Sequence, residues 1–388
     1  MGFPGGATTN DERLTMNDTK EANNMLIRNA NLLNPGTERG IYDILIREGK
    51  IAQIAPHIDA EEEVEVDVQE MYVTPGLVDA HTHLGLKADS QGEFYADHNE
   101  KKSILSPEMR AIDAINPQSV NFKEAREAGI TTCASGPGSL NVIGGQYACI
   151  KTVGNVIDDM VLDPYFAMKC ALGENPKKGY ETTRMGIAAT LRNFLFQAKA
   201  YAEDPNHKFD MKLEPMIPVI RGEKALKIHC HEAIDIVTAV RICDEFHLKF
   251  TLDHVTCGAE VVDFLRKRPE IPLLLGPTLG HRGKVELHGK SFENVVKLAE
   301  GRDVCLITDA PVIPLEYLPV CAGLAIAKGM PYERALEAVT INPARVMGVE
   351  DRVGNLAPGK DADLVIWKDK PFVVIQDPVA VFINGERV

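Results

Sequence analysis

The sequence predicts an α/β fold: a (β/α)8 barrel of the TIM type, accompanied by a small β-sandwich that both ends of the chain build together. Eight short apolar runs alternate with helix-like segments through the middle of the chain, which is typical of βαβ units. Both ends instead carry β-like runs separated by turn residues. A chain of 388 residues also exceeds the roughly 250 to 300 residues at which a single core stops growing. There is therefore room for a barrel and a smaller unit.

The barrel strands are expected at LVDAHTH, GITTCAS, QYACIKTV, YFAMKCALG, LKIHCH, KFTLDHV, IPLLLGP and VCLITDA. Eight is the strand number of such a barrel. Polar side chains gather toward the C-terminal ends of several of these runs. Because these ends form one face of a barrel, where active sites lie, residues far apart in the sequence should meet there.

Both ends of the chain consist of short β-like runs separated by turn residues. From Met25 to about Tyr72, runs such as MLIRNANLL and EEVEVDV alternate with turns, and ADLVIWK and AVFINGERV repeat this near the C-terminus. We expect residues 25–72 and 354–388 to form a composite β-sandwich domain, interrupted by a barrel of residues 73–353. Residues 1–24 are polar and are expected to be a flexible tail.

Composition and charge exclude several classes of protein. The formal net charge of −14, without clustered Lys and Arg, argues against nucleic-acid binding. No apolar run reaches the roughly 20 residues of a membrane-spanning helix, and the start shows no signal peptide. The 8 cysteines form no CxxC pair, so we expect reduced, buried thiols and a cytoplasmic protein without a membrane partner.

Histidines and an aspartate recur at matching positions of the predicted strands. His81 and His83 face the same side of a strand because strand side chains alternate with a period of two. His229 and His254 are about one βα repeat apart, and Asp309 follows about two repeats later. Imidazole and carboxylate groups are ligands of divalent metals. The spacing therefore predicts a metal site at the barrel mouth.

Five segments resemble the amidohydrolase superfamily, close to its imidazolonepropionase and Xaa-Pro dipeptidase branch. They span nearly the whole chain after Met25: VTPGLVDAHTHLGL, LDHVTCG, LITDAPV, AVTINPARVMG and GNLAPGKDADLVIW. The resemblance implies a (β/α)8 barrel with a small β-sandwich from both chain ends. It also implies an enzyme that hydrolyses C–N bonds with one or two divalent metal ions.

Carried over by position, the resemblance implies metal ligands at His81, His83, His229, His254 and Asp309. Asp309 would also shuttle the proton, which makes it the predicted catalytic residue. Lys169 corresponds to a fourth-strand lysine that relatives carry as a carbamate bridging two metals.

The segment after Lys169 departs from the family pattern. It reads ALGENPKK, where the dipeptidases have small residues, so Glu174 is an alternative metal ligand. The two residues would face opposite sides of a regular strand, unless Gly173 breaks the strand and brings Glu174 to the mouth. The metal count and the state of Lys169 stay open.

Three further residues are predicted to bind substrate. His231 should share the inward face with His229, although a hydrogen-bonded barrel histidine fits equally well. His281 and Arg282, after the seventh strand, could meet a substrate carboxylate through the arginine fork, or lie in a solvated loop.

The predicted function is hydrolysis of an amide, dipeptide or cyclic amide by metal-activated hydroxide. A divalent metal lowers the pKa of water from near 16 to about 7 and polarises the carbonyl, and Asp309 passes the proton to the departing nitrogen. Zinc is the first choice, with Mn and Fe as alternatives. A deaminase of a ring amidine and a metal-poor scaffold are the competing interpretations. The expected partner is a small-molecule substrate, and a homo-oligomer is left open.

Overall fold

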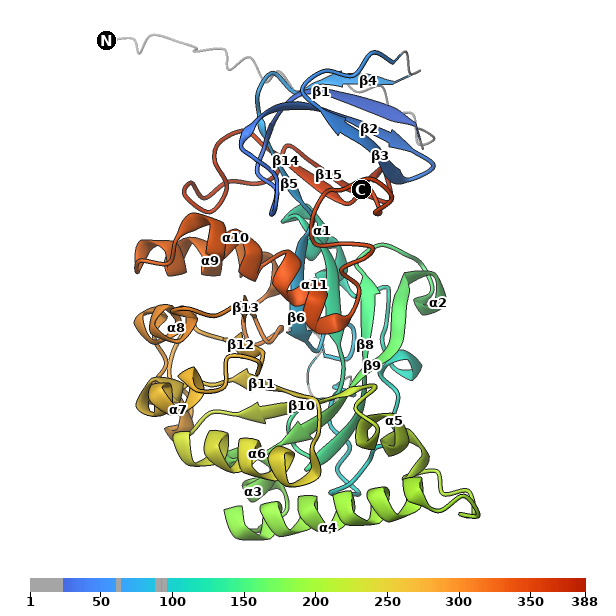
Figure 1. Ribbon diagram of the computed structural model, residues 1–388, viewed down its shortest axis with the longest axis vertical. Helices are drawn as coiled ribbons and strands as arrows, with labels where there is room; N and C mark the ends of the chain where they lie inside the picture. Colours follow the sequence, from blue (N-terminus) through green and yellow to red (C-terminus); the bar gives the residue numbers. More distant parts are fainter. Residues whose placement is uncertain (1–23, 61–63, 88–91, 93–95) are drawn as a thin grey trace, which may run out of the picture.

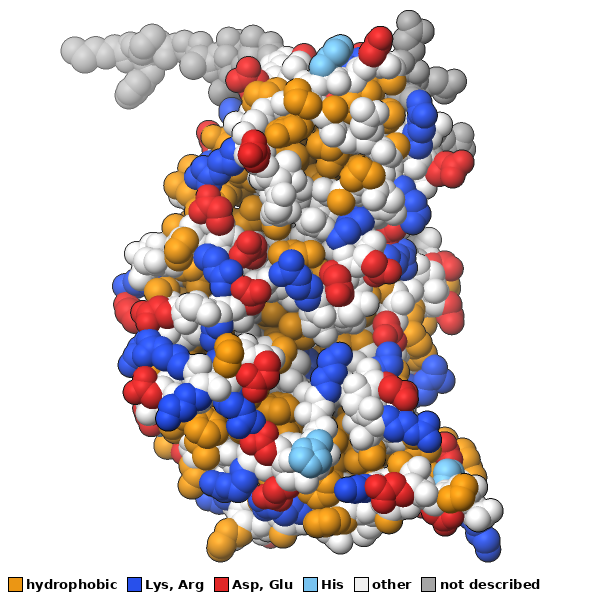
Figure 2. Space-filling model, in the orientation of Figure 1, with side chains coloured by type: hydrophobic (Ala, Val, Ile, Leu, Met, Phe, Trp, Pro, Cys, Tyr) orange, Lys and Arg blue, Asp and Glu red, His pale blue; other side chains and the backbone are white. Residues whose placement is uncertain are grey.

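The protein is described by a computed structural model covering residues 24–60, 64–87, 92 and 96–388. Of the expected tail at 1–24, only Asn24 falls within these residues. Figure 1 shows two parts along the long axis of the molecule: a sheet that combines the first and last strands of the chain, and a barrel with its helices. Side chains of both charges are interspersed over the face seen in Figure 2.

The first sheet has eight strands. Seven follow the order β16-β15-β14-β5-β1-β2-β3, and the eighth, β4, lies outside this order and pairs with β1. The two chain ends meet where β14 pairs antiparallel with β5, with Val365 opposite Thr74. Buried apolar side chains such as Ile27, Ile44 and Phe382 form its core. The strands are β1 (Met25–Leu32), β2 (Gly40–Arg47), β3 (Lys50–Ala55), β4 (Glu65–Asp67), β5 (Tyr72–Pro75), β14 (Leu364–Trp367), β15 (Ala380–Ile383) and β16 (Glu386–Arg387).

The second sheet is the barrel, and each of the eight predicted runs supplies one strand. Its order is β13-β12-β11-β10-β9-β8-β7-β6. The two end strands of this sheet, β6 and β13, lie next to each other at the mouth of the barrel. There the N–H of His83, directly after β6, donates to the carbonyl of Ala310, which follows β13, at 2.7 Å. The strands are β6 (Leu77–Thr82), β7 (Ile130–Ser135), β8 (Ile143–Lys151), β9 (Val161–Ala171), β10 (Ala225–Cys230), β11 (Phe250–His254), β12 (Leu273–Leu275) and β13 (Val304–Leu306).

One strand differs from the regular (β/α)8 pattern. β8 runs antiparallel to both β7 and β9, while the other neighbours in this sheet are parallel. The cause lies in the connection: residues 136–142 join β7 to β8 without a helix, and a parallel partner would need a crossover of a dozen or more residues. The short return keeps the Gly136 backbone at the mouth, beside the first strand.

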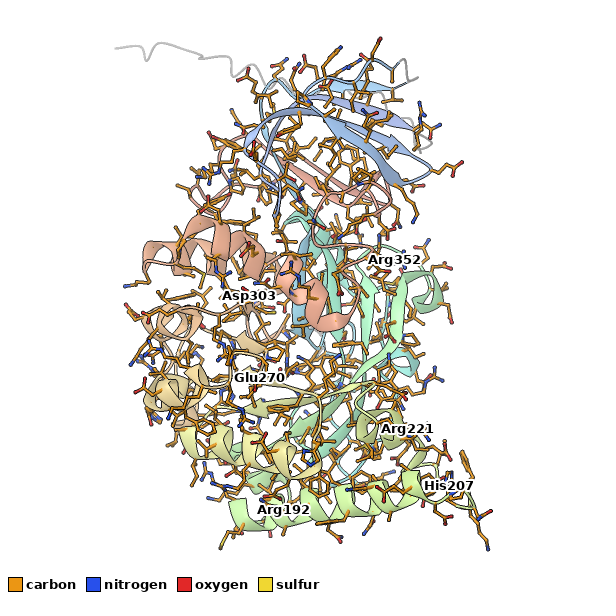
Figure 3. The ribbon with its side chains drawn as sticks, viewed as in Figure 1. Arg192, His207, Arg221, Glu270, Asp303 and Arg352 are labelled. Carbon is orange, nitrogen blue, oxygen red and sulfur yellow. The ribbon has the colours of Figure 1, made fainter. Side chains whose placement is uncertain are left out.

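The helices pack around the barrel with their apolar faces inward. On α6, Ile236, Val240 and Cys243 are buried at the spacing of one helix face. Arg192 of α4, labelled in Figure 3, pairs with Glu245 of α6. The helices are α1 (Val120–Glu127), α2 (Ile157–Met160), α3 (Glu174–Gly179), α4 (Arg184–Glu203), α5 (Ile217–Ile220), α6 (Ala233–Phe246), α7 (Val262–Arg266), α8 (Phe292–Ala299), α9 (Leu318–Ala327), α10 (Tyr332–Ala338) and α11 (Ile341–Met347).

All 8 cysteines are buried, as predicted, and none of them is paired in a disulfide bond. Among the described residues, no helix is both long and apolar enough to cross a membrane.

Candidate active site

The C-terminal ends of the barrel strands bring two groups of side chains together. His81 on β6 and His83 directly after it meet Asp309, which follows β13, and the donor atoms of this group lie within 4.8 Å of one another. The second group brings together His229 on β10, His231 directly after that strand and His254 at the end of β11 in the same way. The rings of His81 and His254 lie 4.8 Å apart, so the two groups are neighbours.

Left-handed backbone conformations place two of these residues. His254 has φ 75° and Asp309 has φ 56°, a region that non-glycine residues seldom occupy. In a regular strand, Asp253 and His254 would face opposite sides. Here Asp253 contacts His81, while His254 joins the second histidine group, so both reach the barrel interior. Backbone strain of this kind is typical of functional sites.

Nδ1 is already engaged in His81, His83 and His254, and also in His231, where it lies 2.7 Å from the Thr256 hydroxyl. Nδ1 of His83 lies 2.7 Å from the Gly136 carbonyl and Nδ1 of His254 lies 2.7 Å from the Gly276 carbonyl. A carbonyl only accepts hydrogen bonds, so each Nδ1 carries the proton and Nε2 of a neutral ring keeps its lone pair. His81 donates from Nδ1 to the Asp253 carboxylate at 2.9 Å. This pattern is the usual one for metal-ligating histidines.

Burial keeps the rings of His81, His229 and His254 uncharged. It lowers the pKa of His81 to about 4, with Lys169 nearby adding to the effect. It lowers the pKa of His254 to about 3. The pKa of His229 falls well below its usual range through burial and the neighbouring His254. At neutral pH the Nε2 atoms therefore offer lone pairs.

The arrangement fits a metal cation. Nε2 of His81 and of His83 lie 3.3 and 3.2 Å from Oδ1 of Asp309. Since both rings carry their proton on Nδ1, neither Nε2 can donate a hydrogen bond to this carboxylate oxygen, and the lone pairs of all three atoms point at one another. Within the described part of the chain, Nε2 of His229 and Nε2 of His254 are buried without a hydrogen-bond partner. Buried polar atoms left without a partner are costly, and a divalent cation would satisfy both sets.

Lys169 points at the histidines, whereas Glu174 does not. Nζ of Lys169 is buried 3.4 Å from Nε2 of His81 and 5.5 Å from the centre of the Tyr147 ring. Burial lowers the pKa of Lys169 to about 8. Glu174 begins α3, its carboxylate pairs with Lys178, and it belongs to neither histidine group.

The three predicted substrate contacts have different positions. The His231 ring stacks on His254 at 4.7 Å, so it lies in the site. His281 and Arg282 lie in an exposed loop after β12, where Arg282 donates to the Lys290 carbonyl at 2.8 Å. The structure does not bring these two into either histidine group.

Several residues of the site escaped the sequence analysis. Asp79 accepts from the N–H and hydroxyl of Thr308 at 2.8 and 2.7 Å, and burial raises its pKa to about 7. Lys227 lies 2.9 Å from Asp253. The period of two was an available signal for both, since Asp79 shares a strand face with His81, and Lys227 shares one with His229. No local signal pointed to Asp253, nor to His98, whose ring lies 5.6 Å from that of His83.

The chain is similar to known proteins in both sequence and fold. The Amidohydrolase family model matches residues 293–388. The crystal structure of an amidohydrolase from Thermotoga maritima is 34% identical, with a TM-score of 0.90 over 94% of this chain and 99% of that one. Imidazolonepropionase of Thermoplasma volcanium is 25% identical over 89% of this chain and 90% of its own length.

Two further relatives are longer. Amidohydrolase tasK of Hapsidospora irregularis is 26% identical over 88% of this chain, which spans 39% of it. Adenine deaminase 1 of Latilactobacillus sakei is 24% identical over 92% of this chain, which spans 57% of it. The match to the Thermotoga protein covers both chains almost completely. The chain therefore belongs to the amidohydrolase family, whose members hydrolyse C–N bonds.

Proposed function

We propose that this protein is a metal-dependent hydrolase that cleaves the C–N bond of a small amide, dipeptide or cyclic amide. The observation that carries the proposal is the convergence of Nε2 lone pairs from His81 and His83 on the Asp309 carboxylate. Such a set has no internal proton to share and is suited to a divalent cation.

The residues divide into two ligand sets. His81, His83 and Asp309 would hold one ion, and His229 and His254 would hold a second. Zinc is the first candidate, because imidazole and carboxylate groups suit it. Lys169 would join the sets as a carbamate, formed when its neutral buried amine, which lies next to His81, adds to CO2 and releases a proton. A free ammonium beside two cations would be repelled, whereas a carbamate would supply anionic oxygen ligands.

Asp309 is the proposed proton carrier. A divalent metal, when bound, would lower the pKa of water and polarise the scissile carbonyl. The Asp309 carboxylate accepts the proton of the attacking water and delivers it to the departing nitrogen. An amine leaves readily only once it is protonated, so the same carboxylate serves both halves of the reaction. His231, whose ring stacks on His254, is the proposed substrate contact.

A deaminase of a ring amidine is the second candidate. The similarity to adenine deaminase 1 favours it, and the same proton transfer would release ammonia from an amino-bearing ring carbon. The two candidates differ in product: a hydrolase of amides yields a carboxylate and an amine or an opened ring, whereas a deaminase yields free ammonia.

The test is turnover by metal-loaded protein on N-acyl amino acids, dipeptides, cyclic amides and amino-bearing nucleobases. Cleavage of any of the first three, lost in Asp309→Asn at unchanged metal content, supports the proposal. Ammonia from nucleobases alone transfers the assignment to the deaminase. Fully loaded protein that is inactive on every class contradicts both.

A further inference from the structure

A second cluster of metal-binding side chains lies outside the catalytic groups. Cys257 follows β11, Glu260 lies in the short helix η4 (Gly258–Val261), and His288 directly follows the short helix η5 (Val285–Leu287). Sγ of Cys257 lies 3.5 Å from Nε2 of His288, which lies 2.9 Å from Oε1 of Glu260. The three donor atoms are all within 4.8 Å of one another. We propose that these side chains form a separate Zn²⁺ site, with water as the fourth ligand.

The distances match the edges of a zinc tetrahedron. Zn–S near 2.3 Å and Zn–N near 2.0 Å place sulfur and nitrogen about 3.5 Å apart, and nitrogen and oxygen about 3.3 Å apart. The first edge equals the observed separation of Cys257 and His288. The second requires His288 and Glu260 to separate by a few tenths of an ångström. Their side chains are 56% and 55% exposed, so they are free to do so.

The backbone holds the thiol in place for this role. Cys257 is 1% exposed, so the sulfur is a fixed ligand, whereas the other two can rotate onto the ion. A Cβ on Gly289 would lie 3.0 Å from the Cys257 sulfur and 2.8 Å from the Thr256 carbonyl. Glycine at 289 therefore lets the chain run close enough to place His288 on the thiol.

The ion would connect two loops at the mouth of the barrel. His288 is two residues from Glu286, a fully buried residue whose Oε2 accepts from the Glu174 N–H at 2.9 Å. Oε1 of Glu286 has no hydrogen-bond partner in the described part of the chain and lies 3.9 Å from Nε2 of His231. A metal held by Cys257 and His288 would fix this turn beside the catalytic histidines.

Cobalt distinguishes this site from the catalytic one. The catalytic groups offer nitrogen and oxygen donors, so thiolate-to-Co²⁺ charge transfer in the near ultraviolet reports Cys257 alone. We expect this band in Co²⁺-titrated protein, its displacement by Zn²⁺, and its loss in Cys257→Ser. His288→Ala alters an exposed side chain and should fold. In this variant we expect half of the band to require at least tenfold more Co²⁺ than in wild type. The matched controls, Cys243→Ser and His207→Ala, should keep it.

Two results would overturn the site. One is wild-type protein that shows no thiolate band even with Co²⁺ in large excess. The other is a band that persists unchanged in both Cys257→Ser and His288→Ala. Because the readout is the absorption of the bound ion, the outcome is independent of whether the catalytic proposal holds.

Discussion

His81 and Asp253 form a fully buried hydrogen bond at the base of the site, with Nδ1 2.9 Å from Oδ2. The same carboxylate oxygen lies 2.9 Å from Nζ of Lys227. Burial would raise the pKa of Asp253, but Lys227 and His81 outweigh it and hold that pKa far below its usual range. The charged carboxylate thus fixes the His81 ring so that Nε2 faces Asp309.

Asp253→Asn should weaken metal binding, although Asp253 is not one of the proposed metal ligands. Loss of the carboxylate removes the partner that orients His81, which typically costs about 10- to 100-fold in metal affinity. It also leaves Lys227 as an unpaired buried charge, so we expect stability to fall by about 3–5 kcal/mol. Metal titration and denaturant unfolding measure the two effects. Exposed Asp263→Asn is the control, and unchanged metal affinity in Asp253→Asn would refute the orienting role.

Asp309→Asn should retain the fold and lose activity by about 10²- to 10⁴-fold, because an amide cannot accept the proton. Turnover is compared at equal metal content, since the substitution also alters a ligand. Asp303→Asn, at an exposed aspartate labelled in Figure 3, should remain active. Near-wild-type turnover of Asp309→Asn with normal metal content would remove Asp309 from the mechanism.

The histidine ligands can be tested one at a time. Alanine at His81, His83, His229 or His254 should reduce bound metal, measured by elemental analysis after dialysis. His231→Ala should keep its metal and instead raise KM. His229 is the most demanding case, because His231 lies next to it, with ring centres 4.6 Å apart. Full metal occupancy in any of the four variants would show that the residue is not a ligand.

Lys169→Ala should lower the metal content from two ions per chain, and added short carboxylates should restore part of it by replacing the carbamate oxygens. Wild-type loading should depend on bicarbonate. Glu174→Gln is the comparison. Because Glu174 pairs with Lys178, this substitution should leave the metal content unchanged. One ion per chain in both wild type and Lys169→Ala, together with loss of metal in Glu174→Gln, would transfer the role to Glu174.

Acid should weaken the sheet of the chain ends through Asp43. Its buried carboxylate pairs with Arg28 at 2.8 Å and accepts from the N–H groups of Ile58 and Asn29. Burial alone would raise the pKa of Asp43, but these partners lower it below the ordinary 3.8. A depressed folded-state pKa stabilises the protein above that ordinary value, and the contribution is lost as the pH falls through the folded-state pKa.

Asp43→Asn should therefore cost about 1–3 kcal/mol of unfolding free energy at neutral pH. The difference from wild type should shrink as the pH is lowered below 3.8. Urea unfolding across this range measures it, with exposed Asp59→Asn as the control. A difference that stays constant down to the most acidic pH would rule out the charge of Asp43 as its cause.

The positions of the barrel strands and of the paired histidines followed from local sequence. His81 and His83 share a strand face because side chains alternate along any strand. The carboxyl ends of barrel strands form one face wherever such a barrel closes. These rules also placed Lys169 among the histidines as one of two alternatives, and the amidohydrolase segments agreed with them.

What the sequence by itself determined was the number of barrel strands, the pairing of the chain ends and the convergence of histidines with Asp309, because these depend on periodicity and strand order. Only the tertiary structure decided the antiparallel direction of β8, the inward turn of Asp253 beside His254, and the placement of Lys169 rather than Glu174 next to His81. The physical reason is that these features depend on distant partners. The Gly136 and Gly276 carbonyls set which histidine nitrogen keeps its lone pair, and left-handed backbone at His254 overrides the alternation that local sequence predicts.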